Sequence, residues 1–317
     1  MLSRRFLRIK SFQALYSYFQ SEDKSIKKLE SEAFLSLERM HDLYLLLLTL
    51  GQELTHLSEL RMEEAKKKRL PTEEDLNPNR RFLENKVLTL LTENVHLKEQ
   101  ATAKKIGWSA DYDLLVKLNA FVRNHEIFKT YMAAPESSFE QDQKFVVDLY
   151  KKILPESELL LSELEDKSIF WGLDEVDFIL SMVIKTIKRF DEKSTISEKI
   201  LPLYSNEKED KKFVKDLLFK VVENDKENSK MIAAKTKNWE VDRIAMVDIL
   251  LMKLAITELL HFKAVPVKVT LNEYIELSKW YSTPKSKMFV NGVLDKLLLE
   301  LKTKGKLKKM GRGLLEG

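Results

Sequence analysis

The chain has 317 residues, of which 33% are charged, with 54 Lys or Arg against 50 Asp or Glu. It has only 8 Gly and 7 Pro and no Cys. This disfavours folds with many turns and excludes disulfides, Cys-based zinc sites and thiol nucleophiles. The longest apolar run, residues 43–50, is too short to cross a bilayer, which needs about 20 residues. We therefore expect an all-α cytoplasmic protein that is not embedded in a membrane.

The first predicted helix covers about Arg4 to Gln20, because apolar residues recur there at three- to five-residue spacing. A longer helical pattern covers about 25–68. The segment LPTEEDLNPNRR at 70–81 then interrupts the pattern with two prolines and two asparagines. Further helices are predicted at about 82–96, 111–132 and 138–153.

An internal repeat follows. Residues 142–190 resemble residues 210–258, which lie 68 positions later. DQKFVVDLYKKIL pairs with DKKFVKDLLFKVV, and the Trp171-x-x-Asp174 motif pairs with Trp239-x-x-Asp242. We interpret the similarity as a duplicated helix pair that stacks on a neighbour. The alternative is a chance similarity between segments that share a helical period.

Helices are predicted in the last third at about 211–224, 241–262, 270–281 and 284–301. Thr270 and Glu273 have capping-box spacing, and Pro284 suits a first helical turn that Thr283 caps. The last of these helices contains Asn291-Gly292, although Gly costs roughly 1 kcal/mol relative to Ala inside a helix. We expect Gly292 to allow a neighbouring backbone to approach closely, while the polar residues around it contact a partner.

Signs of catalysis are absent from the sequence. The five histidines lack metal-site spacing, no Gly-rich loop follows a strand, and no serine shows the elbow of a nucleophile. We therefore predict no catalytic residue, no metal site and no cofactor.

Two clusters instead carry the chemistry of nucleic-acid binding. The first is Arg4, Arg5 and Arg8, whose guanidinium groups suit phosphates. The second is KWYSTPKSK at 279–287, which mixes cations, hydroxyls and aromatic rings that stack on unpaired bases. Trp280 taken alone is interpreted as a core residue, and the basic C-terminal residues as a solvated end.

Four stretches resemble the NusB transcription antitermination family. Residues 265–279, VPVKVTLNEYIELSK, are similar to the family's VPxKVxINEAVELAK, and residues 286–295, SKMFVNGVLD, are similar to SxKFVNGVLD. The opening RRxxR followed by QALY resembles RRxARExAxQALY. A W-R-D-L-A-EL pattern matches the following residues: Trp239, Arg243, Asp248, Leu251, Ala255, Glu258 and Leu259.

The resemblance implies a NusB-like helical bundle with a large inserted helical region. Residues 1–20 would supply its Arg-rich first helix, 21–205 the insertion with the repeat unit at about 142–190, and 206–304 the C-terminal helical domain. Residues 305–317 would form a basic tail. Similarity covers about 20 N-terminal residues and about 95 from Asp210 onward.

The function implied is RNA binding without catalysis. Family members hold a single-stranded boxA element together with the small-subunit ribosomal protein NusE, within the RNA polymerase antitermination complex. Carried over by position, the residues that contact RNA are Arg4, Arg5, Arg8, Tyr281, Lys285, Ser286, Lys287 and Phe289. The residues that face the protein partner are Tyr16, Asp248 and Phe289. Met288 stands where the family usually has Lys, so one cation is missing.

Two other functions remain open at the level of the sequence. One is a helical protein-interaction scaffold that has lost specific RNA binding, which Met288 favours and the retained arginines oppose. The other is an RNA-modification protein, such as a methyltransferase with a NusB-like domain. That function requires a Gly-rich cofactor loop, and only Gly107 and Gly172 fall in the long middle region.

Overall fold

The computed structural model describes residues 2–236, 244–283 and 285–314. Every regular element in these residues is helical, which confirms the predicted all-α class. The helices of the first half are α1 (Arg4–Gln20), α2 (Ile26–Lys66), α3 (Glu73–Leu76), α4 (Lys86–Glu93), α5 (Val95–Lys104), α6 (Tyr112–Asn124), α7 (Glu126–Ala133) and α8 (Phe139–Asp148). The remaining helices are α9 (Glu158–Lys167), α10 (Leu173–Ile187), α11 (Glu207–Glu223), α12 (Asp225–Lys235), α13 (Met246–His261), α14 (Val267–Tyr281) and α15 (Ser286–Thr303).

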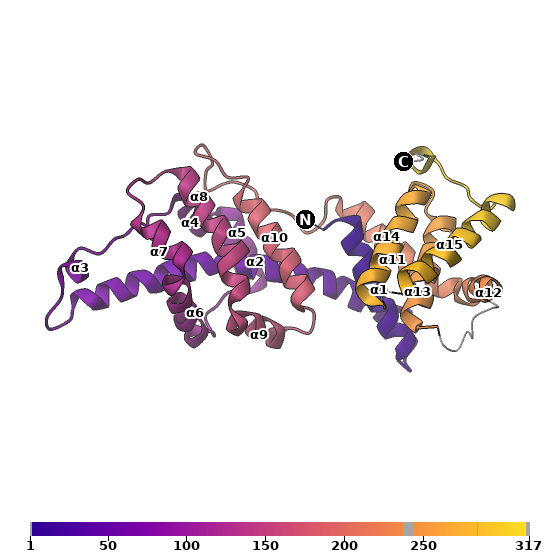
Figure 1. Ribbon diagram of the computed structural model, residues 1–317, viewed down its shortest axis with the longest axis horizontal. Helices are drawn as coiled ribbons and strands as arrows, with labels where there is room; N and C mark the ends of the chain where they lie inside the picture. Colours follow the sequence, from indigo (N-terminus) through magenta and orange to yellow (C-terminus); the bar gives the residue numbers. More distant parts are fainter. Residues whose placement is uncertain (1, 237–243, 284, 315–317) are drawn as a thin grey trace. The chain divides into compact units, whose positions relative to one another are not determined.

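The chain divides into two compact units (Figure 1). Unit 1 comprises residues 38–202, and unit 2 comprises residues 2–37 and 203–317. The first helix of the chain therefore belongs to the same unit as α11 to α15. None of the helices in the described ranges has an apolar stretch long enough to span a membrane.

The bounds of α1 agree with the prediction, whereas two other predicted helices are each divided. Asn94 separates α4 from α5, and its side chain accepts a hydrogen bond from the backbone N–H of Leu97 at 2.8 Å. His125 separates α6 from α7, and its Nδ1 accepts from the N–H of Ile127 at 3.1 Å. These side chains satisfy the free N–H groups of a new helix, so the chain can end one helix and begin the next within one residue.

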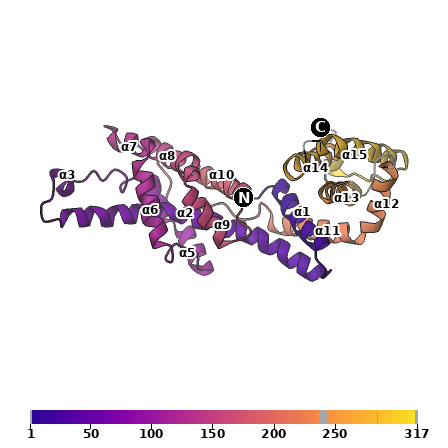
Figure 2. The same cartoon turned by 60° about the horizontal axis from the view of Figure 1, so that its bottom comes forward.

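Unit 1 is built on the second part of α2. Three buried polar groups tie other elements to it: Tyr44 bonds to Thr186 at 2.6 Å, Trp108 donates to the carbonyl of Leu46 at 2.9 Å, and Tyr150 donates to that of Leu47 at 2.7 Å. Beyond α2 the chain passes through α3 and returns to the rest of the unit, as Figure 2 shows.

The element bounds support the predicted repeat, which stays a prediction. Helix α8 begins at Phe139 and α11 at Glu207, while α9 ends at Lys167 and α12 at Lys235. Both pairs are separated by the same 68 positions as the sequence repeat. The equivalent acids Asp142 and Asp210 are 1% and 4% exposed. The motif residues Trp239 and Asp242 lie outside the described residues, as does Arg243.

The helix α14 begins earlier than predicted. Its N-cap is Pro266, whose backbone is extended, and the helix starts at Val267. The predicted capping box at Thr270 and Glu273 is therefore wrong, because both residues lie inside the helix. The Thr270 hydroxyl instead donates to the Glu258 carboxylate at 2.9 Å. The predicted first-turn residue Pro284 lies outside the described residues.

Candidate functional site

A buried ion pair joins α1 to α13 in unit 2. The guanidinium of Arg8 donates two hydrogen bonds, of 2.8 and 2.7 Å, to the carboxylate of Glu258. The side chains are only 3% and 0% exposed. Burial by itself lowers the pKa of Arg8, but the hydrogen bonds and the negative charge of Glu258 together outweigh it and raise the pKa above its usual value. Arg8 therefore remains charged and bound to Glu258.

Glu258 is the centre of a larger polar cluster. Besides Arg8, its carboxylate accepts hydrogen bonds from the hydroxyls of Thr270 at 2.9 Å and Tyr274 at 3.0 Å, both on α14. Burial, followed by the negative charge of Glu258, raises the pKa of Tyr274 well above its usual value. The cluster fixes α1, α13 and α14 relative to one another. Arg8 was predicted to contact RNA, and its buried, fully engaged guanidinium gives it a structural role.

Arg4 and Arg5 lie one turn earlier on α1 and are half-exposed. Arg5 donates two hydrogen bonds of 2.9 Å to Glu273, and its side chain is 51% exposed. Arg4 lies 3.2 Å from Asp210, 40% exposed, with its guanidinium 4.5 Å above the centre of the Phe213 ring. The two arginines are accessible, but their acidic partners are less so: the side chains of Asp210 and Glu273 are 6% and 16% exposed.

Two contacts align α1 with α14. Arg5 bonds to Glu273, and Gln13 donates to the Tyr281 hydroxyl at 3.3 Å, both across 268 positions of sequence. The rings of Phe12 and Tyr281 also lie 5.0 Å apart. The two helices thus run in the same direction over these two turns. The Arg-rich opening motif and the residues before α15 belong to one continuous surface.

The far end of this surface is the junction between α14 and α15. Lys285 and Lys287 are exposed there, and Phe289 is half-buried. Ser286, in contrast, is 6% exposed, and its hydroxyl bonds to those of Ser282 at 2.8 Å and Thr283 at 2.9 Å. Its position indicates that it shapes the junction.

Trp280 corrects one interpretation of the sequence. It was interpreted as a core residue, but it is 71% exposed. Met288, on the first turn of α15, is 73% exposed. Two large apolar side chains therefore flank the exposed lysines of the junction.

Gly292 provides a second correction. A Cβ built on it meets no atom within 4 Å outside its own helical turn, so no other backbone among the described residues approaches it. The expected close approach within the fold is therefore wrong. Asn291 meanwhile donates to Asp295 within the same helix at 3.1 Å. The cost of glycine at this position has no explanation in the packing of the chain.

Two of the residues predicted to face a protein partner, Tyr16 and Asp248, lie near the start of α13. Tyr16 is 36% exposed, and its hydroxyl accepts from Gln20 at 3.4 Å. Gln20 also donates to the sulfur of Met246, the first residue of α13, at 3.1 Å. Asp248 is 4% exposed and has no described hydrogen-bond partner for its Oδ1. The Arg8–Glu258 cluster lies at the other end of α13.

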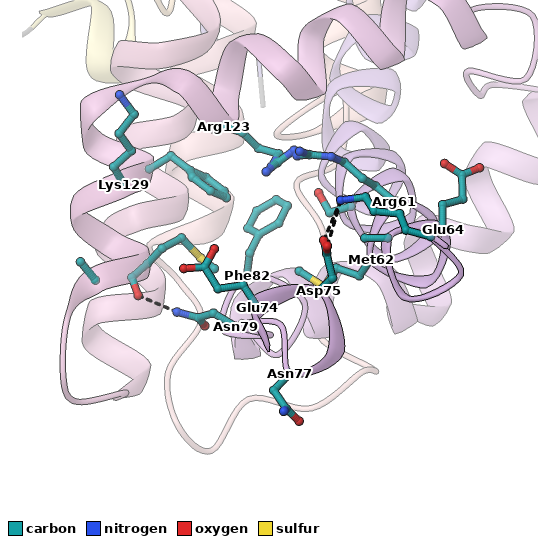
Figure 3. Close-up of a pocket in the computed structure, with 16 residues that line it drawn as sticks. Arg61, Met62, Glu64, Glu74, Asp75, Asn77, Asn79, Phe82, Arg123 and Lys129 are labelled. Carbon is teal, nitrogen blue, oxygen red and sulfur yellow. Dashed lines mark hydrogen bonds and ion pairs between the residues drawn. The ribbon is translucent and has the colours of Figure 1, made fainter. Parts of the chain in front are cut away.

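Unit 1 contains a separate groove of about 1020 Å³. Its apolar wall includes Met62, Phe82 and Phe128. In Figure 3 the side chains of Arg61 and Arg123 point toward each other across it. None of the residues predicted to bind RNA or a protein partner lines this groove. Within the described residues, no three His, Asp or Glu side chains are grouped so that they could hold a metal ion.

The sequence alone did not identify the acids that hold the arginines. Glu258 and Glu273 occur in strings that resemble the family, but their helical spacing gives no sign that they lie opposite α1. Lys309 was also missed: its Nζ donates to the backbone carbonyls of Glu258 at 3.3 Å and Phe262 at 3.0 Å.

The fold and the site define an all-α protein whose C-terminal unit carries a half-exposed basic and aromatic surface. Comparison with known families identifies it further: residues 176–298 match the model described as "NusB family". This part of the chain is a NusB-family domain. The match begins inside α10, earlier than the predicted domain start at residue 206, and leaves residues 1–175 outside it.

Similar proteins carry the name transcription antitermination protein NusB. The one from Salinibacter ruber is 46% identical over 103 residues, which are 32% of this chain and 64% of the relative. The one from Chloroherpeton thalassium is 47% identical over 106 residues, 32% of this chain and 50% of the relative. The one from Clostridium botulinum is 45% identical over 78 residues, which are 24% of this chain and 59% of the relative. The chain thus spans between half and two thirds of the length of these relatives. No solved structure matches it.

Proposed function

We propose that this protein is a transcription antitermination factor of the cytoplasm and binds single-stranded boxA-type RNA. It acts without catalysis, together with the ribosomal protein NusE and within the RNA polymerase antitermination complex. The relatives at 45–47% identity bear the name of such a factor.

One observation carries the RNA-binding proposal. The two ends of the chain that resemble the family, which are more than 260 positions apart, form one surface through the contacts of Arg5 with Glu273 and Gln13 with Tyr281. RNA phosphates would lie on Arg4 and Arg5, and unpaired bases near Tyr281, whose ring is half-buried. Positive charge next to aromatic faces is the usual chemistry of single-strand binding.

The RNA surface then continues onto the junction of α14 and α15. Lys285 and Lys287 are exposed there and can follow the RNA backbone. Phe289 is half-buried one turn into α15 and would contact RNA or the protein partner. Ser286 supports the junction from inside, and we assign it a positioning role. Arg8 is left out of the contacting set, because contact would require breaking its buried pair.

The protein partner would dock at the start of α13. Tyr16 offers an exposed ring edge there. Asp248 is 4% exposed, so its carboxylate would have to be uncovered on docking before it could meet a basic ribosomal protein. This position leaves the arginines and the α14–α15 junction open for RNA.

A second function, a scaffold that binds proteins only, is favoured by one observation. Trp280 and Met288 are 71% and 73% exposed, and exposed aromatic residues and methionines are enriched at protein interfaces. In that case the junction would bind a protein whether or not RNA is present.

The experiment is equilibrium binding of labelled boxA RNA and of a scrambled RNA, with and without NusE, across a salt series. We expect selective binding that NusE strengthens and salt weakens. The double variant Arg4→Ala/Arg5→Ala should reduce the slope of log affinity against log salt by about 1.4, since each single-strand phosphate contact contributes about 0.7.

A matched control is Lys98→Ala/Lys117→Ala, which removes two exposed cations from unit 1. It should leave the slope unchanged. Equal, weak binding of both RNAs at every salt concentration would refute the RNA function. If Trp280→Ala then weakened NusE binding in the absence of RNA, the scaffold function would be supported.

A further inference from the structure

The basic C-terminal segment, residues 302–314, is folded onto unit 2. It carries six cations and no acidic residue: Lys302, Lys304, Lys306, Lys308, Lys309 and Arg312. In Figure 1 the segment, in yellow, leaves the end of α15 and returns toward α14. It was interpreted from sequence as a solvated end, and the contacts it makes contradict that interpretation.

Lys309 anchors the segment to the end of α13. Its Nζ donates to the carbonyls of Glu258 and Phe262 at 3.3 and 3.0 Å. Carbonyls at the C-terminal end of a helix carry partial negative charge, so an ammonium group is favourable there. Lys309 is half-buried, and this burial lowers the pKa of its ammonium group. The N–H of the next residue, Met310, bonds to the carbonyl of Lys263 at 3.0 Å.

Three glycines fit the path of the segment. Gly305 and Gly311 have φ values of +61° and +55°, a region that other residues rarely adopt. A Cβ on Gly313 would lie 1.9 Å from the carbonyl oxygen of Lys263, so only glycine fits. A solvated tail would need none of these features. The segment has a specific, packed conformation.

The conformation leaves the other cations available. Lys302, Lys306, Lys308 and Arg312 are exposed, and none forms an ion pair with a described carboxylate. Lys304 is the exception, since it pairs with Glu300. Four unpaired cations on a short packed segment make a strip of positive potential, and such a strip attracts a polyanion.

The strip lies at the same end of α13 as the proposed RNA surface. Glu258 links the two: its carboxylate holds Arg8 of α1, while its backbone carbonyl accepts from Lys309 of the segment. Arg4 and Arg5 lie one helical turn from Arg8. An RNA strand bound to these arginines therefore has a second set of cations close to one end of its path.

We propose that the C-terminal basic segment is a second phosphate-binding strip, which extends the RNA site beyond the surface formed by α1, α14 and α15. The inference rests on the proposed RNA function and deepens it. The strip contacts the sugar–phosphate backbone and reads no bases. It adds affinity for RNA that continues past the boxA element at one end.

The test compares three RNAs: the boxA element alone, and the same element extended by a run of uridines at its 5′ end or at its 3′ end. The wild-type protein should bind one extended RNA more tightly than the core element. If Lys306, Lys308 and Arg312 each meet one phosphate, the salt slope should steepen by about 2. The advantage of the extension should then fall roughly 20-fold over a fourfold rise in salt.

Three variants assign the effect. Lys306→Ala/Lys308→Ala/Arg312→Ala should lose the advantage of the extended RNA and bind the core element normally. Gly313→Ala keeps every charge but displaces the segment from Lys263, and it should lose the same advantage. The control Lys98→Ala/Lys117→Ala/Lys188→Ala removes three exposed lysines of unit 1 and should behave as the wild type.

The possible failures are distinguishable. If neither extension improves binding, or if the triple variant weakens core and extended RNA equally, the strip is refuted while the boxA function stands. If Gly313→Ala retains the full advantage, the segment acts only as a flexible basic tail, and the packed strip is wrong. If the extension effect is present but boxA and scrambled cores bind alike, the strip stands and the antitermination proposal fails. If the protein binds no RNA, both proposals fall.

Discussion

The buried pair of Arg8 and Glu258 allows a quantitative test of what holds unit 2 together. The substitution Arg8→Met removes one partner and leaves a carboxylate that is 0% exposed without its main counter-charge. Breaking a buried pair from one side costs about 3–5 kcal/mol of unfolding free energy. Glu258→Leu should cost at least as much, because it also removes the acceptor of the Thr270 and Tyr274 hydroxyls.

The double variant Arg8→Met/Glu258→Leu removes both charges together. Replacing a whole buried ion pair by apolar residues is often neutral or nearly so. The Tyr274 hydroxyl still loses its acceptor, which costs about 1–3 kcal/mol if it stays buried and unpaired. We therefore expect the double variant to be more stable than either single variant.

The assay is hydrogen exchange of peptides from α13 and α14, since the two units can unfold separately and a single global transition would mix them. Arg5→Ala is the control, because it breaks a half-exposed pair and should cost less than about 1 kcal/mol. The reasoning is refuted if Arg8→Met costs no more than Arg5→Ala, or if the cost of the double variant equals the sum of the two single costs.

Further predictions concern four other positions. Burial, helped by the charge of Lys104, lowers the pKa of His41 to about 4. Because the folded state then binds this proton less tightly than the unfolded chain, unit 1 should lose up to about 3 kcal/mol between pH 6.5 and 4, and urea titrations of His41→Gln should lack that loss. Gly292→Ala should stabilise α15 by about 0.5–1 kcal/mol, since its Cβ meets nothing within 4 Å. Compared with Gly292→Ala, Gly51→Ala should give a free energy of unfolding that is lower by about 1 kcal/mol or more, since its Cβ would lie 2.7 Å from a methyl group of the buried Leu88. Equal shifts in thermal midpoint for the two variants would contradict this. Met288→Lys adds an exposed cation to the RNA surface and should steepen the salt slope for boxA RNA by about 0.7, and an unchanged slope would place Met288 away from the RNA.

The sequence predicted helices and residue classes better than it predicted contacts. Helix α1 was predicted with its observed bounds because its apolar spacing is regular. Asn94 and His125 were missed as boundaries because the apolar pattern continues across them, while their side chains cap the next helix. Such local hydrogen bonds leave no trace in hydrophobic periodicity.

In the candidate site, too, the residue types were predicted from the sequence but their contacts were not. Three arginines were predicted together on α1, but whether each is buried depends on acids more than 200 positions away. Arg8 meets Glu258 in the interior, whereas Arg5 meets Glu273 at the surface. Trp280 was interpreted as a core residue because aromatic residues at a helix end usually pack inward. Its exposure depends on how α14 meets α15, which periodicity does not specify.

The central claim is that α1, the end of α14 and the start of α15 form one RNA-binding surface. The most direct measurement is a cross-linking map, in which boxA RNA carrying photoreactive uridines is irradiated with the wild-type protein and the attached peptides are identified. The account predicts cross-links to peptides that contain Arg4 and Arg5 and to those that cover residues 279–289, in excess of those formed by a scrambled RNA. Cross-links concentrated in unit 1, or the same pattern with both RNAs, would contradict it.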